Sequence, residues 1–271
     1  MIHKVSFYGK TTWFTKQHLI DWFLCLGIFV IESVLFNFVI QPFHRFEPES
    51  STSPYDFQLI QYPLLPDIVP VWLLMLISLG LPMIVFIGYH IKNRNSHDFH
   101  HAALGLFQAF TITMLFTDIL KVSAGRYRPD YGERLATGIA SVIREGRVSF
   151  PSGHSSVSFC GMTFLSFYLC GKTKVFLKDG GNIIKALVCL CPFIISSLIA
   201  VSRTVDYHHD FSDILAGSVI GLAIGIFVYF MNFNSLFSKE CSLPKNRINP
   251  HYARDGLLSS EYQSLSISSS L

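Results

Sequence analysis

Two long runs of this sequence contain no charged residue. Residues 68–89 and 214–238 are stretches of 22 and 25 residues without a single Asp, Glu, Lys or Arg. A helix needs about 20 mainly apolar residues to cross the hydrocarbon core of a bilayer. Charged residues make up 14% of the chain, whereas about 25% is usual in soluble domains. The runs therefore predict a membrane protein, and the composition excludes a disordered chain.

Six segments of the chain are apolar enough to be read as membrane-crossing helices. The first is the least regular, because Asp21 and Glu32 interrupt it. The sequence thus predicts an all-α fold, a polytopic membrane bundle with six transmembrane helices that together form one domain over 19–233. The predicted spans cover about 19–40, 68–90, 101–120, 153–171, 184–201 and 213–233.

The distribution of basic residues predicts the orientation of this bundle. Six spans place both termini on one side of the membrane. The N-terminal segment 1–18, the loops after the second and fourth spans and the tail 234–271 hold 13 basic residues, against 8 in the other loops. Because basic loops remain in the cytoplasm, both termini are expected there. Ser fills seven of positions 259–271, so the tail is expected to be disordered.

Three polar clusters lie where predicted spans end, all on the expected non-cytoplasmic side. They cover residues 121–129, 151–154 and 202–213. Ionisable groups near a membrane core are costly, at about 2.5–3.5 kcal/mol each at mid-helix, so a cluster of them indicates a charged ligand. Among the basic residues of the clusters are Lys121, Arg128 and Arg203. Their fixed positive charges suit phosphate oxygens.

The remaining members of the clusters can supply a nucleophile and a proton donor. Ser152 and Gly153 lie at an expected helix start, where backbone N–H groups are available to an anion. His209 and Asp213 are four residues apart, so the carboxylate can fix the imidazole tautomer. His154 is a second, independent imidazole. Together with the basic residues, this set suits phosphoryl transfer through a covalent histidine intermediate.

The clusters also fit a known set of motifs. They match K-x6-R-P, P-S-G-H and S-R-x5-H-x3-D, with every fixed position filled and in order. The sequence therefore resembles the type 2 phosphatidic acid phosphatase, or lipid phosphate phosphatase, superfamily over residues 118–225. Segments 41–43 and 125–130 look like the fungal diacylglycerol pyrophosphate phosphatase branch.

This resemblance implies a role for each motif residue. His209 would be the nucleophile, Asp213 would hold it neutral and aimed, and His154 would act first as general acid and then as base. The implied phosphate-binding residues are Lys121, Arg128, Ser152, Gly153 and Arg203. The implied enzyme is a hydrolase that removes phosphate from diacylglycerol pyrophosphate, phosphatidate and related lipid phosphates through a phosphohistidine. It would need no metal or other cofactor, because no carboxylate cluster suits magnesium.

Three other readings of these residues remain open. A lipid phosphotransferase or head-group transferase could use the same histidine with an alcohol as acceptor. A non-catalytic lipid-binding membrane protein could keep the fold alone. The third reading is a metal site formed by Asp206, His208, His209 and Asp213.

The environment of the site is expected to be lumenal or extracytoplasmic. The vacuole, the endoplasmic reticulum or Golgi and the plasma membrane all agree with that topology. The expected partners are a lipid phosphate substrate and the bilayer. Nucleic acid is excluded, because 21 basic residues are balanced by 18 acidic ones.

Two smaller features complete the sequence-based expectations. Only His209 lies both six residues after Arg203 and four residues before an Asp, since Ser212 occupies the latter place for His208. Apolar residues recur at helical spacing in 134–145, which predicts a short helix that either packs on the surface or lies at the membrane interface beside the site. Histidines outside the motifs, among them His18, His100 and His101, fit no pattern and are assigned no function.

Overall fold

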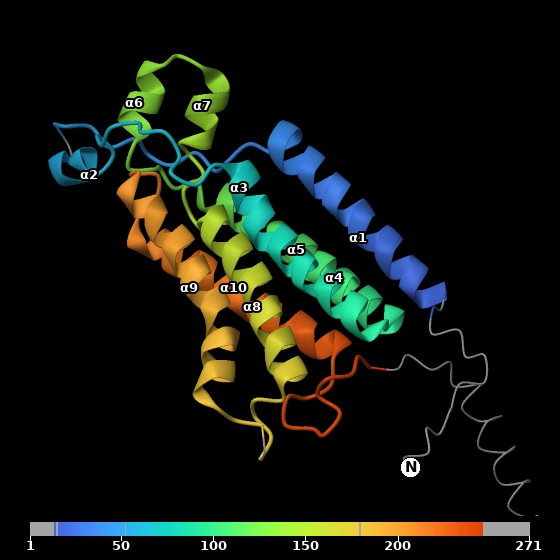
Figure 1. The fold of residues 1–271 in the computed structure, drawn as a ribbon. Helices are drawn as coiled ribbons and strands as arrows, with labels where there is room; N and C mark the ends of the chain where they lie inside the picture. The colour runs from blue at the N-terminus through green and yellow to red at the C-terminus, as the bar shows by residue number, and fades with distance from the viewer. Residues whose placement is uncertain (1–13, 15, 52, 179, 246–271) are drawn as a thin grey trace, which may run out of the picture.

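A computed structural model of the chain describes residues 14, 16–51, 53–178 and 180–245 (Figure 1). Its described residues form helices and loops and contain no strand, which confirms the all-α prediction. The elements are α1 (Lys16–Val34), the π-helical turn η1 (Leu35–Val39), α2 (Pro54–Gln58), α3 (Val71–Met75), the π-helical turn η2 (Leu76–Gly80), α4 (Leu81–Asn93), α5 (Ser96–Ala124), α6 (Tyr131–Ala136), α7 (Ala140–Glu145), α8 (Gly153–Thr173), α9 (Ile183–Val205) and α10 (Phe211–Asn232).

The long helices alternate in direction through the bundle. Helices α1, α5 and α9 run one way, and α8, α10 and the rod made of α3, η2 and α4 run the other way (Figure 1). The short helices α6 and α7 cover the end at which α5 and α9 finish. Helix α1 begins and α10 ends at the opposite end.

Within the described residues, five helices are long and apolar enough to cross a membrane. They are Lys16–Val34, Val71–Asn93, Ser96–Ala124, Ile183–Val205 and Phe211–Asn232. Helix α8 has 21 residues but is rich in Ser, Gly, Cys and Thr, and most of it is buried against α5, α9 and α10. A helix enclosed by other helices needs no apolar face toward lipid. The multi-pass prediction is therefore supported, whereas composition qualifies five helices instead of the predicted six.

Glycines on α10 allow it to lie directly against α8. A β-carbon at Gly217 would lie 2.4 Å from the carbonyl oxygen of Ser152, and one at Gly221 would lie 2.2 Å from that of Ser156. No side chain fits within such a contact, so these positions require glycine. This close packing holds the beginnings of α8 and α10 side by side, and two of the three motifs lie there.

A buried ion pair fixes α5 to α8 at the opposite end. The Asp98 carboxylate accepts hydrogen bonds from Lys172 Nζ and, at 2.8 Å, from the Tyr168 hydroxyl. Lys172 also lies over the Tyr168 ring, 4.7 Å from its centroid. These contacts satisfy charges that would otherwise be buried without a partner.

The segment that follows α10, residues 233–245, folds back on the bundle. Phe233 and Pro244 form an isolated β-bridge, and the Lys245 N–H donates to the carbonyl of Asn232 at 2.9 Å. Cys241 is buried against the end of α8. The structure thus differs from the disorder expected from residue 234, because apolar side chains return this segment to the bundle. The rest of the predicted tail, 246–271, lies outside the described residues, as does most of segment 1–18.

The helix expected over 134–145 is two short helices, α6 and α7. Arg134 is buried and donates to Asp130 Oδ1 at 2.7 Å, so the polar face of α6 points inward. Leu135 and Ile139 are 47% and 55% exposed. Gly138, with φ of 67°, breaks the helical path between them.

Candidate active site

The three motifs meet at the end of the bundle that α6 and α7 cover (Figure 1). The last turn of α5 carries Lys121, and the following loop carries Arg128. A β-carbon at Gly153 would lie 3.1 Å from Lys121 Nζ, so the ammonium group lies over the first turn of α8. The Ser152 N–H donates to the Asp213 carbonyl at 3.0 Å and joins the starts of α8 and α10. Ser152 Oγ also caps α8 by accepting from the Ser155 N–H.

His209 is buried between a carboxylate and a hydroxyl. Its Nδ1 lies 3.6 Å from Asp213 Oδ2 and 3.4 Å from Ser149 Oγ. Ser149 Oγ in turn donates to the same carboxylate oxygen at 2.5 Å. A carboxylate facing Nδ1 favours the tautomer that carries its proton there. The lone pair is then on Nε2, which is the nitrogen that could attack an electrophile.

An arginine holds the carboxylate that faces His209. Arg126 Nη1 lies 2.7 Å from Asp213 Oδ1, and its Nη2 lies 2.5 Å from Asp210 Oδ2. Asp210 and Asp213 also form the capping box that begins α10. Asp213 is therefore fixed by the helix start as well as by Arg126 and Ser149, neither of which was predicted to take part in the site.

The surroundings of His209 keep its imidazole neutral. Burial lowers the pKa of His209 well below its ordinary value, and the positive charges of Arg128, Lys121 and Arg203 lower it further, as does His154. Desolvation and nearby cations both disfavour the imidazolium. The imidazole is therefore an unprotonated base at neutral pH, as a nitrogen nucleophile must be. The predicted basic residues and His154 therefore all lie close enough to this ring to affect its charge.

His154 is held through one of its two ring nitrogens. Its Nε2 lies 2.9 Å from the carbonyl oxygen of Val69, in the loop before α3. A carbonyl can only accept, so Nε2 must carry a proton. The other nitrogen, Nδ1, is then the atom able to exchange protons with a bound molecule. His154 also lies within electrostatic range of Arg203, Asp67 and Lys121.

The two arginines of the cluster are buried and only partly paired. Arg128 Nη2 lies 3.2 Å from Glu145, whose side chain is 56% exposed. Arg203 bridges Asp67 at 2.7 Å and Asp206 at 2.9 Å. Within the described part of the chain, the Nε–H groups of both arginines are buried without a hydrogen-bond partner. Buried donors without partners are costly, and an anion with several acceptor oxygens would satisfy both.

His208 faces away from His209 into a separate ion-pair network. Its Nδ1 lies 2.7 Å from Asp130 Oδ2, and its Nε2 lies 3.1 Å from Asp67 Oδ1. Burial would raise the pKa of Asp130, but hydrogen bonds from His208 and Arg134 and the nearby arginine charges outweigh it, so the carboxyl pKa is lowered. The network fastens the loop after α9 to the α6 segment.

The metal site considered from sequence does not assemble as a unit. His209 and Asp213 pair with each other, whereas Asp206 and His208 group by ligand spacing with Asp67. The Arg203 guanidinium already lies between the two carboxylates of that group. A cation there would have to displace a buried positive charge, so this donor set does not fit a metal.

A cavity of about 630 Å³ opens beside the cluster. Lys121 and Arg128 form part of its wall, and Arg144 and Glu145 of α7 form another part. The remaining wall is mixed: Phe36 and Phe38 of η1 form an apolar side, and Asp118 and Ser141 are polar. The cavity thus joins a basic end to an apolar side.

Several groups around the motif residues carry no sequence signal of their own. Asp67 and Val69 lie in a loop without periodicity, and Ser149 lies two residues before the second motif. Arg126 stands inside the first motif segment but at a position that its pattern leaves free. Glu145 ends a segment that was read for its apolar spacing.

Comparison with known proteins agrees with this geometry. The sequence profile of the PAP2 superfamily matches residues 102–236, which include all three motifs. A PA-phosphatase related-family protein of Dictyostelium discoideum is 91% identical over the whole of both chains. Lipid phosphate phosphatase 2 of Arabidopsis thaliana is 38% identical, and the alignment covers 85% of this chain and 82% of the relative.

A fungal phosphatase is also similar in sequence to this chain. The probable diacylglycerol pyrophosphate phosphatase 1 of Schizosaccharomyces pombe is 33% identical, with 74% of this chain and 77% of the relative covered. No solved structure matches the chain.

Proposed function

The chain belongs to the PAP2 superfamily and is a phosphatase, and we propose that it removes phosphate from lipid phosphates by way of a phosphohistidine on His209. The proposed substrates are diacylglycerol pyrophosphate, phosphatidate and related lipids, and the reaction needs no metal ion. The observation that carries the proposal is the buried imidazole of His209, whose Nδ1 faces Asp213 and which lies among the charges of Lys121, Arg128 and Arg203.

In the first step, His209 Nε2 attacks the phosphorus atom. The N–P bond forms as the bond from phosphorus to the leaving oxygen breaks. His154, protonated on both ring nitrogens once the anionic phosphate is bound beside it, gives its Nδ1 proton to that oxygen, while its Nε2–H remains on the Val69 carbonyl. The Nδ1–H of His209 faces Asp213 and would close to a hydrogen bond with it as positive charge develops on the ring. Catalytic hydrogen bonds that are long without substrate, such as this 3.6 Å contact, shorten in the complex.

In the second step, water replaces the histidine on phosphorus. His154, now neutral at Nδ1, accepts a proton from the water as its oxygen bonds to phosphorus and the N–P bond breaks. Phosphate leaves, and both histidines return to their starting states.

The basic cluster stabilises the charge on the phosphoryl oxygens in both steps. The unpartnered Nε–H groups of Arg128 and Arg203 would bind these oxygens, with Lys121 Nζ and the Ser152 hydroxyl alongside. The backbone N–H of Gly153, at the start of α8, adds a donor at the positive end of a helix dipole. Fixed cations of this kind do the electrostatic work that magnesium does in other phosphatases.

The cavity beside Lys121 and Arg128 suits a lipid whose tails stay in the bilayer. The head group would occupy the basic end, and the first part of the acyl chains would lie along Phe36 and Phe38. We place six spans in the membrane, counting α8, with both termini cytoplasmic and the site on the lumenal or extracytoplasmic face. A protease-accessible tag at the C-terminus tests that orientation.

The deciding experiment measures phosphate release and the covalent intermediate together. Purified protein is expected to release phosphate from diacylglycerol pyrophosphate and phosphatidate, and acid-labile, base-stable ³²P is expected on wild type after a rapid quench. His154→Ala should retain that label for longer, and His209→Ala should never acquire it. Transfer of label to added alcohol in place of water would favour the transferase, and no turnover on a broad lipid-phosphate panel would favour a binding protein.

A further inference from the structure

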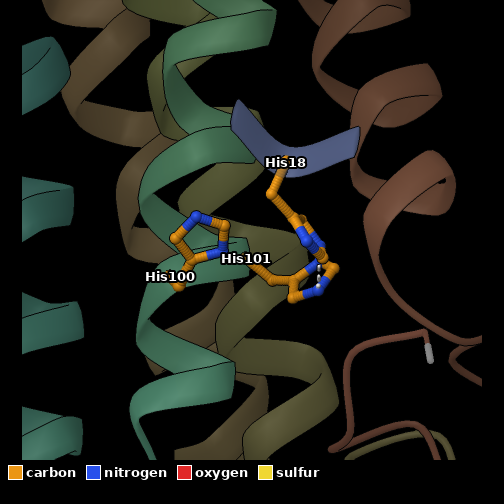
Figure 2. Close-up of side chains that lie close together, drawn as sticks. All are labelled: His18, His100 and His101. Atoms are coloured by element: carbon orange, nitrogen blue, oxygen red, sulfur yellow. Dashed lines mark hydrogen bonds between the residues drawn. The ribbon is translucent and has the colours of Figure 1, made fainter. Parts of the chain in front are cut away.

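Three imidazoles meet at the end of the bundle opposite the motif cluster (Figure 2). His18 comes from the first turn of α1, and His100 and His101 come from the second turn of α5. One ligand nitrogen of each ring lies within 4.8 Å of the other two. His18 and His101 are fully buried, and His100 is half-buried.

The closest pair already has the spacing of two ligands on one ion. The Nε2 atoms of His18 and His101 lie 3.3 Å apart. A tetrahedral zinc ion with Zn–N bonds of 2.0–2.1 Å places its nitrogen ligands about 3.3–3.4 Å apart. The third nitrogen would need to move by at most about 1.6 Å to complete the same geometry, which a rotation of the His100 side chain could supply.

The hydrogen bonds of the cluster leave lone pairs where a metal needs them. Trp22 Nε1–H donates to His100 Nε2 at 3.1 Å, so that nitrogen is unprotonated. Of the two facing Nε2 atoms of His18 and His101, one donates and the other accepts. A metal ion bound by all three rings would displace the Trp22 contact, and the ring that now donates through Nε2 would carry its proton on Nδ1 instead, so that all three ligands stay neutral.

We propose that His18, His100 and His101 form a binding site for a divalent transition-metal ion of the zinc type. Three neutral imidazoles without a carboxylate suit zinc, cobalt, nickel or copper and do not suit magnesium or calcium. The ligands come from two helices 83 residues apart in sequence. The ion therefore fastens α1 to α5, and α1 otherwise exposes most of its side chains.

This site is separate from the phosphatase site. Lys121 follows His101 by twenty residues on the same helix, which is a distance of about 30 Å along the helix axis. An ion bound there cannot contact the substrate, so the metal site and metal-independent hydrolysis are independent proposals.

Metal content of the full-length protein tests the proposal. The chain is purified in detergent without a polyhistidine tag, stripped with a chelator, dialysed and reconstituted with Zn²⁺. One tightly held zinc per chain is expected, with affinity at least about tenfold weaker in His18→Gln and in His101→Gln. His90→Gln is the matched control, because His90 is another half-buried imidazole that packs on α5 through Phe99. Equal affinity in all four proteins, or no retained zinc in wild type, would overturn the site.

The coordination of the bound zinc and its effect on stability give two further tests. X-ray absorption of the zinc-loaded wild type should show three imidazole ligands at about 2.0–2.1 Å. Zinc should also raise the melting temperature of wild type and of His90→Gln but leave that of His18→Gln unchanged. Absorption from oxygen ligands alone would mean that the ion binds elsewhere.

Discussion

Arg126 Nη1 lies 2.7 Å from Asp213 Oδ1, on the carboxylate whose other oxygen faces Nδ1 of His209. Arg126 contacts the Asp213 carboxylate, and Asp213 in turn faces the imidazole of His209. In the proposed mechanism Arg126 is therefore a positioning residue. Arg126→Ala is expected to lower kcat by about 10- to 100-fold, as is usual when a residue supporting a catalytic group is lost.

The pH profile separates positioning from a general loss of structure. Without Arg126, the uncompensated Asp213 charge would stabilise the imidazolium of His209, so the acid limb of kcat/KM should move to higher pH. Arg147→Ala serves as control, because Arg147 lies in the same region and does not contact Asp213. A fall in kcat with an unmoved acid limb would argue against the positioning role.

The low pKa of His209 has a consequence for activity in acid. Free histidine gains its proton near 6.5, whereas burial and the cations Arg128, Lys121 and Arg203 hold the His209 pKa well below that value. As pH falls, the neutral nucleophile is lost only on passing through the lowered pKa, so the acid limb of kcat/KM lies below pH 6.5.

Removing one of those cations should shift the acid limb of the kcat/KM profile to higher pH. Arg128→Gln deletes a positive charge that disfavours the imidazolium, so the pKa of His209 rises and activity is lost at a higher pH than in wild type. A soluble short-chain lipid phosphate should be used for these profiles. A limb that stays in place, or that moves to lower pH, would contradict the electrostatic account.

Adjacent histidines should respond in opposite ways to substitution. His209→Ala is expected to abolish turnover. His208→Ala removes contacts to Asp130 and Asp67 and should cost about 1–3 kcal/mol of stability while leaving most of kcat. Phosphate release and thermal unfolding measured on both variants test this pair. The reverse pattern would identify His208 as the nucleophile.

The fold was predictable from sequence where lipid contact dominates the composition. Most of each long apolar run, 68–89 and 214–238, lies in a helix of membrane-spanning length, because lipid-facing helices must be apolar. Helix α8 shows the limit of that rule, because its neighbours bury its Ser and Gly residues. The predicted disorder from residue 234 was wrong for the segment up to Lys245. Its composition is mostly polar, and the few apolar side chains that return it to the bundle do not change that average.

The motif residues of the site were predictable because their chemistry restricts both residue type and spacing. Their supports were not. Arg126, Ser149 and Val69 act through single contacts that only the folded chain creates, and Val69 contributes just a backbone carbonyl. The histidine cluster was equally invisible, because His18 meets His101 across 83 residues of sequence.

Chelation should leave hydrolysis intact. In the proposed mechanism the phosphate is bound by the side chains Lys121, Arg128 and Arg203, and the nearby carboxylate pair Asp67 and Asp206 already binds Arg203. Protein dialysed against EDTA and then assayed in EDTA should keep at least about half of its kcat, as electrostatic stabilisation by fixed cations predicts. A requirement for added Mg²⁺ would contradict the mechanism.

Arg144 is placed to distinguish a pyrophosphate from a monoester. Its Nη2 donates to the carbonyls of Phe36 and, at 3.0 Å, Ile40, and its side chain forms one wall of the cavity that holds Lys121 and Arg128. When His209 attacks the terminal phosphate of a lipid pyrophosphate, the second phosphate would lie on the side of this cavity. Arg144→Gln should therefore lower kcat/KM for diacylglycerol pyrophosphate about tenfold more than for phosphatidate, as expected for loss of a charge-assisted hydrogen bond. The ratio of the two substrates cancels any shared loss of folded enzyme, and Arg147→Gln should leave that ratio unchanged. An equal effect of Arg144→Gln on both substrates would show that the residue only anchors η1.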